Sequence, residues 1–495
     1  ELVEEIGGYI EQDELARCAR VCKSWYGAFI PQLYRHVRYD NHSCKMVALW
    51  TATQKHSRHM RSLAVIANDF PELALLGPEC CHLTTLSLVP LAFVNQQWCS
   101  WLRALIDLNP SIHTLYILLN EQLDRMLFHG EHNILKQMSA LRNLSVLNDH
   151  YPKDRTKSSG VFEAILECGS QLESLTYEVV RSRPIPEAEP MEASLDIVHR
   201  QPWTKLVSLN IHDQDGRREI ELLSHCPNLW LYKTRVDCRR NGYESLHLLA
   251  QNYTSGDPLY RLEHLEIMQM QGPKTAAALD ELLQVCAGPS GLKTFYAVDS
   301  IASQITIKTL LTYHAKTLET VVMSSAPWPS PGDLHLLLTM CPRLRHLETF
   351  VWSEEPKKPW LHDLMKSPWI CTDLRILHLI TRQKNESPLI EASQVELLSG
   401  QEDVLASLQR QFWNRIGALK NLSTLHLNTE SRLRIFPTPL SIIPEDIEQL
   451  CGLNHLQEFQ IPPWQEFMSP AVKEELQLKR PDLQIEYIDE MQLLA

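Results

Sequence analysis

A short leucine pattern, L-x-x-L-x-L with conservative replacements, recurs along most of this chain. Clear copies occupy residues 83–88, 112–117, 141–146, 172–177, 206–211, 262–267, 292–297, 318–323, 344–349, 374–379, 422–427 and 456–461, and weaker copies begin at Leu229 and Leu483. The copies are mostly about 30 residues apart, and helix-like segments such as 280–288 and 334–344 lie between them. One strand and one helix per repeat cannot bury an apolar face alone, so the pattern predicts a stacked solenoid.

The repeats resemble the leucine-rich-repeat family over residues 61–495. That resemblance implies an α/β fold in which the leucines point inward and the strands form a parallel sheet on the concave side. The family's asparagine, eight positions after the first leucine, occurs clearly only at Asn120, so we expect an irregular solenoid. Segments 181–202 and 381–410 interrupt the pattern and are predicted to be loop insertions.

The N-terminal segment carries more apolar residues than a small unit needs. Its periodicity predicts helices over residues 1–10, 13–22 and 23–30, the last ending at Pro31 because proline does not continue a helix easily. Three short helices within about 40 residues rarely form a self-sufficient core. We therefore expect this unit to pack on the following domain, on another protein, or on both.

The same segment resembles an F-box. The resemblance is carried by Leu2, Val3, Glu5, Ile6, Tyr9, Ile10, Asp13, Leu15, Cys18, Val21, Cys22, Lys23, Trp25, Pro31, Leu33, Tyr34, Arg35 and Val37. The usual Leu-Pro start is absent, which is consistent with a chain that begins inside the domain. We expect a three-helix F-box at residues 1–38, a linker helix at 39–60 and the solenoid at 61–495.

The F-box resemblance implies docking on a Skp-type adaptor of a cullin-based SCF ubiquitin ligase. An interface of this kind would bury the surplus apolar surface and would favour a large aromatic anchor. The candidate adaptor-binding residues are Leu2, Ile6, Ile10, Leu15, Val21 and Trp25. About half of the apolar residues in such a unit are expected in its internal core instead.

The strand residues between the leucines are the candidates for target binding, because side chains alternate between the two faces of a strand. The later repeats offer the larger polar and aromatic groups, at His264, Glu266, Tyr296, His346, Glu348, His378 and His426. The alternative interpretation is that each is an ordinary solvated sheet residue.

Composition and motifs indicate a binding protein. The formal charge of −13 is atypical of a nucleic-acid binder, and no apolar run is long enough to span a bilayer. Thirteen scattered cysteines and no secretory signal indicate reduced thiols and a cytoplasmic or nuclear location. The cluster His42, Cys44, His56 and His59 matches no zinc spacing. We therefore predict no metal, no cofactor, no catalytic residues and no homo-oligomer.

The chain resembles the F-box and leucine-rich-repeat proteins abundant in fungi, and that resemblance implies a non-catalytic substrate receptor of an SCF ubiquitin ligase. Two alternatives stay open. The first is a non-degradative scaffold or adaptor built on the same repeats. The second is an enzyme on a repeat scaffold, which would require a catalytic constellation in a closed pocket.

Overall fold

The computed structural model describes most of the chain. The described residues are 12–40, 53–67, 76, 79–90, 96–128, 133–148, 160–179, 202–212, 217–235, 242–255, 262–268, 273–287, 291–298, 304–323, 330–353, 360–383, 402–430, 442–461 and 468–487. The first predicted helix and the insertion at 181–201 lie outside them. The chain divides into two compact units, residues 1–229 and 230–495.

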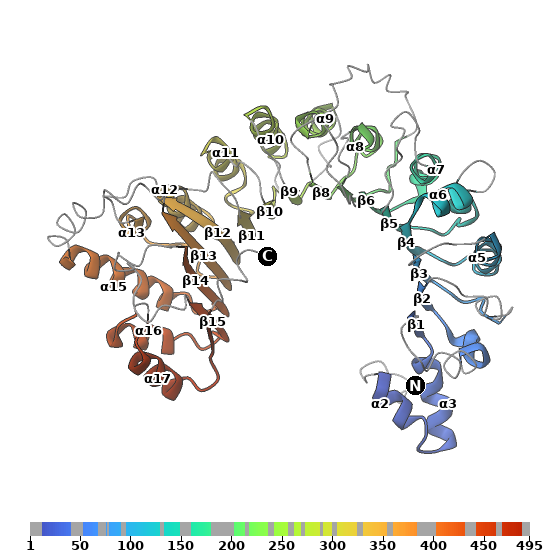
Figure 1. Cartoon of the computed structure of the whole chain (residues 1–495). Coiled ribbons are helices and arrows are strands. Elements are labelled where there is room, and N and C mark those ends of the chain that lie inside the picture. The colour runs from blue at the N-terminus through green and yellow to red at the C-terminus, as the bar shows by residue number, and fades with distance from the viewer. Residues whose placement is uncertain are drawn as a thin grey trace. The chain divides into compact units, whose positions relative to one another are not determined.

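The first unit contains a parallel sheet whose strands follow one another in sequence order (Figure 1). Its strands are β1 (His36–Asp40), β2 (Ser62–Ala67), β3 (Thr85–Pro90), β4 (Thr114–Leu119), β5 (Asn143–Asn148), β6 (Ser174–Val179) and β7 (Ser208–His212). Its helical segments are α2 (Gln12–Cys18), α3 (Lys23–Leu33), η1 (Ser57–His59), α5 (Gln96–Leu108), α6 (Glu121–Phe128), η4 (Ile134–Gln137), α7 (Gly160–Cys168), η5 (Gly169–Gln171) and α8 (Arg217–Leu223).

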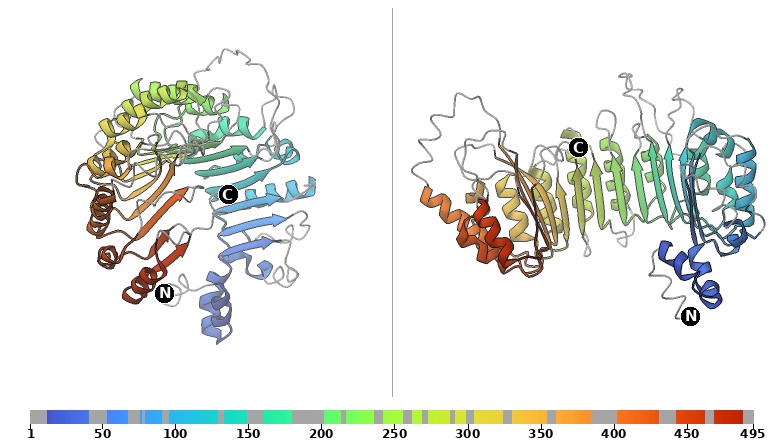
Figure 2. Two further views of the ribbon diagram at one scale, coloured as in Figure 1. Left: turned by 60° about the vertical axis from the view of Figure 1, so that its left-hand side comes forward. Right: turned by 60° about the horizontal axis from the view of Figure 1, so that its bottom comes forward.

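The second unit has the same parallel strand order. Its strands are β8 (Leu231–Arg235), β9 (His264–Met268), β10 (Thr294–Val298), β11 (Thr320–Met323), β12 (His346–Ser353), β13 (Ile376–Gln383), β14 (Thr424–Glu430), β15 (Glu458–Ile461) and β16 (Gln484–Tyr487). Its helical segments are α9 (Gly242–Ser255), α10 (Pro273–Val285), α11 (Gln304–His314), α12 (Pro331–Met340), α13 (Trp360–Leu364), α15 (Glu402–Ala418), η7 (Pro444–Asp446), α16 (Ile447–Cys451) and α17 (Pro470–Lys479). The views in Figure 2 show these helices on one face of the sheet. We call the opposite face of this sheet the open face.

The leucines of the repeat pattern form the core between strands and helices. In the first clear copy, Leu83, Leu86 and Leu88 are all fully buried, and the residues between them are half-buried. This alternation follows from the period of two along a strand, which sends successive side chains to opposite faces. The predicted α/β solenoid with a parallel sheet is confirmed within each unit, and both weak copies of the pattern also precede strands, β8 and β16.

A buried asparagine closes one of the turns that follow a repeat helix. Asn109 follows α5, and its side-chain amide donates to the carbonyls of Cys80 and Leu105 at 2.6 and 2.8 Å. Its Oδ1 accepts from the backbone N–H of Leu83 at 2.8 Å. Backbone groups that would otherwise be buried without partners are thereby satisfied across two successive repeats.

Two other repeats use different side chains for the same purpose. His314 Nδ1 accepts from the Leu292 N–H at 3.0 Å, so its Nε2 carries the proton and donates to the Leu283 carbonyl at 2.7 Å. Arg480 likewise reaches back one repeat, to the carbonyls of Leu453 and Leu456, each at 2.7 Å.

Asn120, the residue that matched the family's asparagine position, has a local role. Its Oδ1 accepts a hydrogen bond from the N–H of Leu123 at 2.9 Å, at the start of α6. This is the geometry of an N-cap, which satisfies one of the free donors in the first helical turn. The turns thus use several unrelated polar side chains, which agrees with the irregular repeats in the sequence.

Two sequence predictions about the N-terminal segment differ from the structure. Helix α3 does not end at Pro31 but continues to Leu33, because proline removes only its own N–H bond, and the Tyr34 N–H still donates to the Ile30 carbonyl at 3.1 Å. The sheet begins at β1, before residue 61, since β1 pairs with β2 in parallel. Of the predicted linker helix at 39–60, residues 41–52 lie outside the described residues, and residues 53–56 and η1 are helical.

The second predicted insertion contains a repeat helix. Residues 402–410 belong to α15 rather than to a loop. The apolar side chains Leu408, Phe412 and Ile416 recur every four residues and are buried, so they form one helical face against the sheet. The proposed insertion is therefore shorter than the sequence predicted.

Candidate functional site

Helix α3 presents apolar side chains on its exposed surface. Trp25 is 41% exposed and Tyr26 is 43% exposed, and Val21, in the turn before the helix, is 64% exposed. The Trp25 ring packs edge-on against Phe29, with centroids 5.5 Å apart, so its orientation is partly held by the helix itself. An exposed cluster of large apolar residues is typical of a protein-binding surface.

The same helix contributes its other face to a small internal core. Leu15, Ala19, Phe29 and Ile30 form a buried cluster, with Leu15 only 5% exposed. Cys18, Leu33 and Tyr34 pack around this cluster. Of the predicted adaptor-binding residues, Val21 and Trp25 are therefore on the surface and Leu15 is in the core, while Leu2, Ile6 and Ile10 lie outside the described residues.

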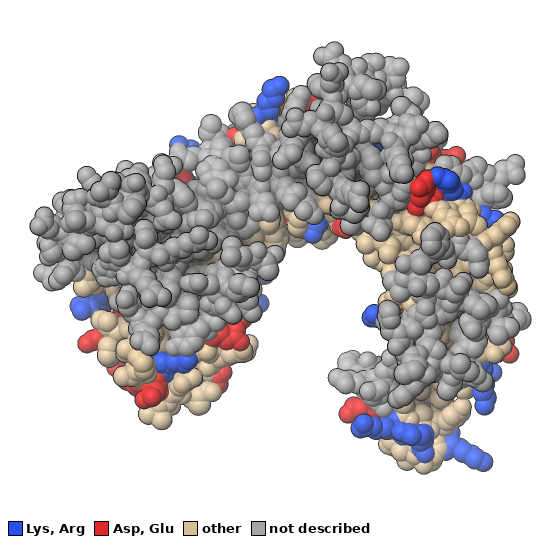
Figure 3. Space-filling view, in the orientation of Figure 1, with Lys and Arg blue, Asp and Glu red and all other residues tan. Residues whose placement is uncertain are grey.

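The F-box-like helices carry exposed positive charge. Arg17 on α2, Arg20 in the turn after it and Lys23 at the start of α3 are all exposed, and basic side chains gather at these helices in Figure 3. Among residues 14–30 with described side chains, Glu14 is the acidic residue. An exposed aromatic side chain and exposed cations on the same two helices fit a partner surface that has both apolar and acidic groups.

The open face of the second unit brings the predicted target-binding residues into two rows. The strand register places His264, Thr294, Thr320 and His346 in one row. In the adjacent row lie Lys233, Glu266, Tyr296, Val322, Glu348, His378, His426 and Gln460. Residues on neighbouring strands that share a row can contact one another directly, because strands are about 4.8 Å apart.

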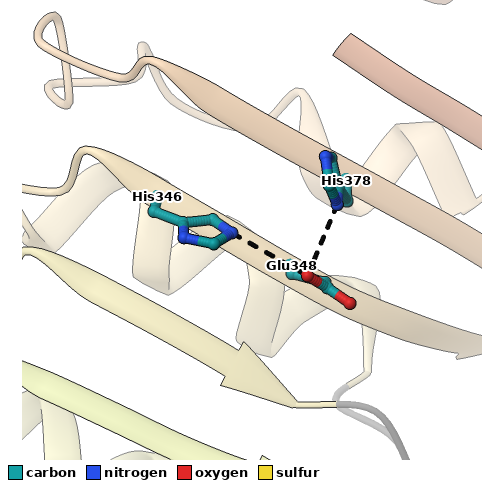
Figure 4. Close-up of side chains that lie close together, drawn as sticks. All are labelled: His346, Glu348 and His378. Atoms are coloured by element: carbon teal, nitrogen blue, oxygen red, sulfur yellow. Dashed lines mark ion pairs between the residues drawn. The ribbon is translucent and has the colours of Figure 1, made fainter. Parts of the chain in front are cut away.

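Glu348 joins two imidazoles within these rows. Its Oε2 lies 3.4 Å from His378 Nδ1 and 3.8 Å from His346 Nε2 (Figure 4). The three side chains are half-buried, and their ligand atoms all lie within 4.8 Å of one another. Two strands supply them: His346 and Glu348 are two residues apart on β12, and His378 is the register neighbour of Glu348 on β13.

The cluster continues onto the next strands. The rings of His378 and His426 stack with centroids 3.8 Å apart and an interplanar angle of 9°. His426 Nε2 lies 3.1 Å from an oxygen of Glu458 on β15. Four of the seven predicted target-binding residues, His346, Glu348, His378 and His426, are thus gathered in one place.

Electrostatics of the cluster favour the charged form of the Glu348 carboxyl. Contact with His346, and next with His378, lowers the pKa of Glu348 to about 2. Burial, and next the neighbouring His378, lowers the pKa of His426. Glu348 is therefore a carboxylate throughout the physiological range.

The remaining predicted residues lie apart from this cluster. Glu266 pairs with Lys233 Nζ at 2.7 Å, and Tyr296 is its neighbour on β10. The rings of His264 and the exposed Trp230 meet edge to face, with their centroids 4.4 Å apart. Sequence analysis overlooked Lys233, Glu458 and Trp230. The weak leucine copy at Leu229 marks β8, which contains Lys233 and directly follows Trp230, and the copy at 456–461 marks β15, which contains Glu458.

Four buried cysteines in the described ranges offer little nucleophilic character. Burial raises the pKa of the thiols of Cys80, Cys341 and Cys371 to about 12, and that of Cys99 to about 11. A thiolate is the reactive form, so these side chains are core groups. Of the histidine and cysteine cluster weighed for zinc, His42 and Cys44 lie outside the described residues, and His56 is engaged by the Tyr26 hydroxyl at 3.2 Å.

No helix in the described ranges is both long and apolar enough to cross a membrane. A comparison with curated proteins finds no match for the chain. A comparison with protein-family models matches residues 1–40 to the F-box-like family. The chain therefore carries an F-box-like domain at its N-terminus, followed by a solenoid of strand and helix repeats.

Proposed function

We propose that this protein is the substrate-recognition subunit of an SCF-type ubiquitin ligase, acting in the cytoplasm or nucleus. Its F-box binds a Skp-type adaptor, and its repeats, which we assign to the leucine-rich-repeat class, bind a target protein. The observation that carries the proposal is the F-box-like match over residues 1–40. The exposed Trp25 and Val21 on that domain support it.

The N-terminal unit would bind the adaptor through its surplus apolar surface. Trp25 and Val21 leave apolar surface in water that a docked partner would remove, and burial of such surface is the main driving force of association. The exposed cations Arg17, Arg20 and Lys23 on the same helices would favour an acidic partner and would speed association at low salt. Leu15 would contribute indirectly, by holding α2 against α3.

The open face of the second unit would bind the target. It offers charged, aromatic and imidazole groups in two regular rows, with no described helix covering them. The protein itself would perform no chemistry in this role. Its contribution would be proximity, because tethering a target beside a ubiquitin-conjugating enzyme raises its effective concentration.

The test is adaptor binding by purified wild-type chain and two tryptophan variants, measured by calorimetry. Trp25→Ala should weaken binding by about 30-fold, since truncating an aromatic hot spot typically costs about 2 kcal/mol. Trp230→Ala is the matched control, because Trp230 is equally exposed, at 43%, and lies in the other unit. Circular dichroism and thermal melts would verify that both variants fold.

Two outcomes would contradict the adaptor role. One is equal weakening by the two tryptophan variants. The other is no binding by the folded wild-type chain and none by the same chain extended with Leu-Pro before Glu1. The ligase role is tested separately, by assembly with a cullin and adaptor-dependent ubiquitination of a captured target. A scaffold would bind the adaptor and yet support no ubiquitination.

A further inference from the structure

We propose that His346, Glu348 and His378 form a binding site for a divalent transition metal of the zinc type on the open face of the second unit. Two imidazoles and one carboxylate are a common donor set for zinc and for other borderline metals. The site does not rest on the proposed ligase function, because metal binding is measured without adaptor or target.

The spacing of the donor atoms fits a small tetrahedral ion. Bonds of about 2.1 Å from zinc to nitrogen and oxygen put tetrahedral ligand atoms about 3.4 Å apart. The His378 Nδ1 to Glu348 Oε2 distance is 3.4 Å, and the His346 Nε2 to Glu348 Oε2 distance is 3.8 Å. The two histidine nitrogens lie within 4.8 Å of each other, so a tetrahedral ion would draw the His346 ring inward.

His346 provides a second, independent indication. Its Nε2 is screened from solvent and has no hydrogen-bond partner among the described residues, since 3.8 Å to Glu348 is beyond hydrogen-bond range. Leaving such a nitrogen unpaired is unfavourable, because it gives up its bonds to water and gains none in the protein. An ion between His346 and Glu348 would satisfy the imidazole lone pair and the carboxylate charge together.

The backbone holds the ligands before any ion arrives. His346 and Glu348 are on one face of β12 because they are two residues apart, and the parallel register fixes His378 beside Glu348. The His426 ring stacks on His378 and restricts its rotation. Ligands carried on paired strands lose little freedom on binding, which favours affinity.

The donor set also indicates which ions would bind and how. Calcium and magnesium prefer all-oxygen sites, so they would compete poorly with zinc here. Three protein ligands leave a fourth position, which water would fill and which a donor side chain of a bound protein could replace. The site could therefore link target binding on this face to the presence of metal.

The test is titration of the full chain, stripped of metal by chelation, with Zn²⁺ in calorimetry and with Co²⁺ in absorbance. We expect one ion per chain and the visible bands of tetrahedral Co²⁺. His378→Gln and Glu348→Gln should each weaken binding by at least about 100-fold, because even outer-shell partners are worth about 10–100-fold.

His264→Gln is the matched control, because His264 lies in the same row as His346 on the same face and belongs to no three-ligand cluster among the described residues. Its metal affinity should equal that of the wild type. Circular dichroism would show that all variants are folded. Absence of stoichiometric binding by the wild type would overturn the proposal, and so would equal binding by His378→Gln, Glu348→Gln and wild type.

Discussion

Replacement of Asn109 by leucine tests whether buried polar side chains hold successive repeats together. Asn109 is 1% exposed and makes three hydrogen bonds to backbone groups. Leucine has the same branched arrangement of side-chain heavy atoms, so Asn109→Leu would keep the shape of the side chain, remove the bonds and place a bulkier methyl group against the carbonyls. The backbone N–H of Leu83 and the carbonyls of Cys80 and Leu105 would then each lose this partner.

The expected cost follows from these three groups. A buried backbone group left without a partner costs about 1–3 kcal/mol, and the gain from a more apolar side chain offsets part of that cost. We therefore expect Asn109→Leu to destabilise its repeats by about 3–5 kcal/mol. Asn109→Asp should be similarly damaging at pH 7, because a carboxylate oxygen would face two carbonyl oxygens at the positions now 2.6 and 2.8 Å away.

The aspartate variant should also make stability depend on pH, which a packing defect alone would not do. In Asn109→Asp, the two carbonyls and burial would raise the folded-state pKa of the new carboxyl above its unfolded value. The part of the unfolding free energy lost to ionisation would therefore be absent below the unfolded pKa. It would grow as pH rises from there through the folded pKa. Asn109→Leu, which has no titratable group, should show no such dependence on pH.

Hydrogen exchange is the suitable assay, because repeat arrays open locally rather than all at once. Amides in residues 79–128 should lose protection in both variants, while those in the second unit should keep it. Asn421→Leu is the control: Asn421 is exposed, and a surface change of this kind is worth about 0.5 kcal/mol or less. Wild-type protection in folded Asn109→Leu would refute the reasoning.

Two further predictions concern buried titratable groups. His314→Leu should cost about 2–4 kcal/mol by leaving Leu292 N–H and Leu283 C=O without this partner. Burial lowers the pKa of His314, so the wild type should also lose stability as pH falls below the unfolded value near 6.5, and melts of the two proteins between pH 7 and 5 should converge. Partial burial has the opposite effect on an acid and raises the pKa of Asp280, so its ionised form opposes folding at neutral pH. Asp280→Asn should therefore melt above the wild type at pH 7, with the difference vanishing near pH 4, and a lower melting temperature at pH 7 would contradict this.

Local periodicity was sufficient to predict the repeating fold. The leucines of each copy are buried wherever they are described, because the positions of apolar residues along a strand decide which face can leave water. The prediction was weakest at boundaries. Pro31 did not end α3, and α15 extends into the predicted insertion, since packing of a whole helical face outweighs a single local signal.

The N-terminal unit shows what composition alone leaves open. Its excess of apolar residues indicated that some surface would remain unburied. The packing of α2 against α3 then decided that Leu15 and Phe29 face inward and that Trp25 faces outward. All three are equally apolar in the sequence, so their roles depend on which side of each helix meets the other.

The histidine and carboxylate cluster depended on tertiary structure most of all. Alternation along the strands predicted that His346, Glu348 and His378 share one face of the sheet. Only the register of β12 with β13 places His378 beside Glu348, because register is set by how whole repeats stack. Sequence therefore determined which side chains reach the open face, and tertiary structure decided which of them meet, since contact requires strands from different repeats to align.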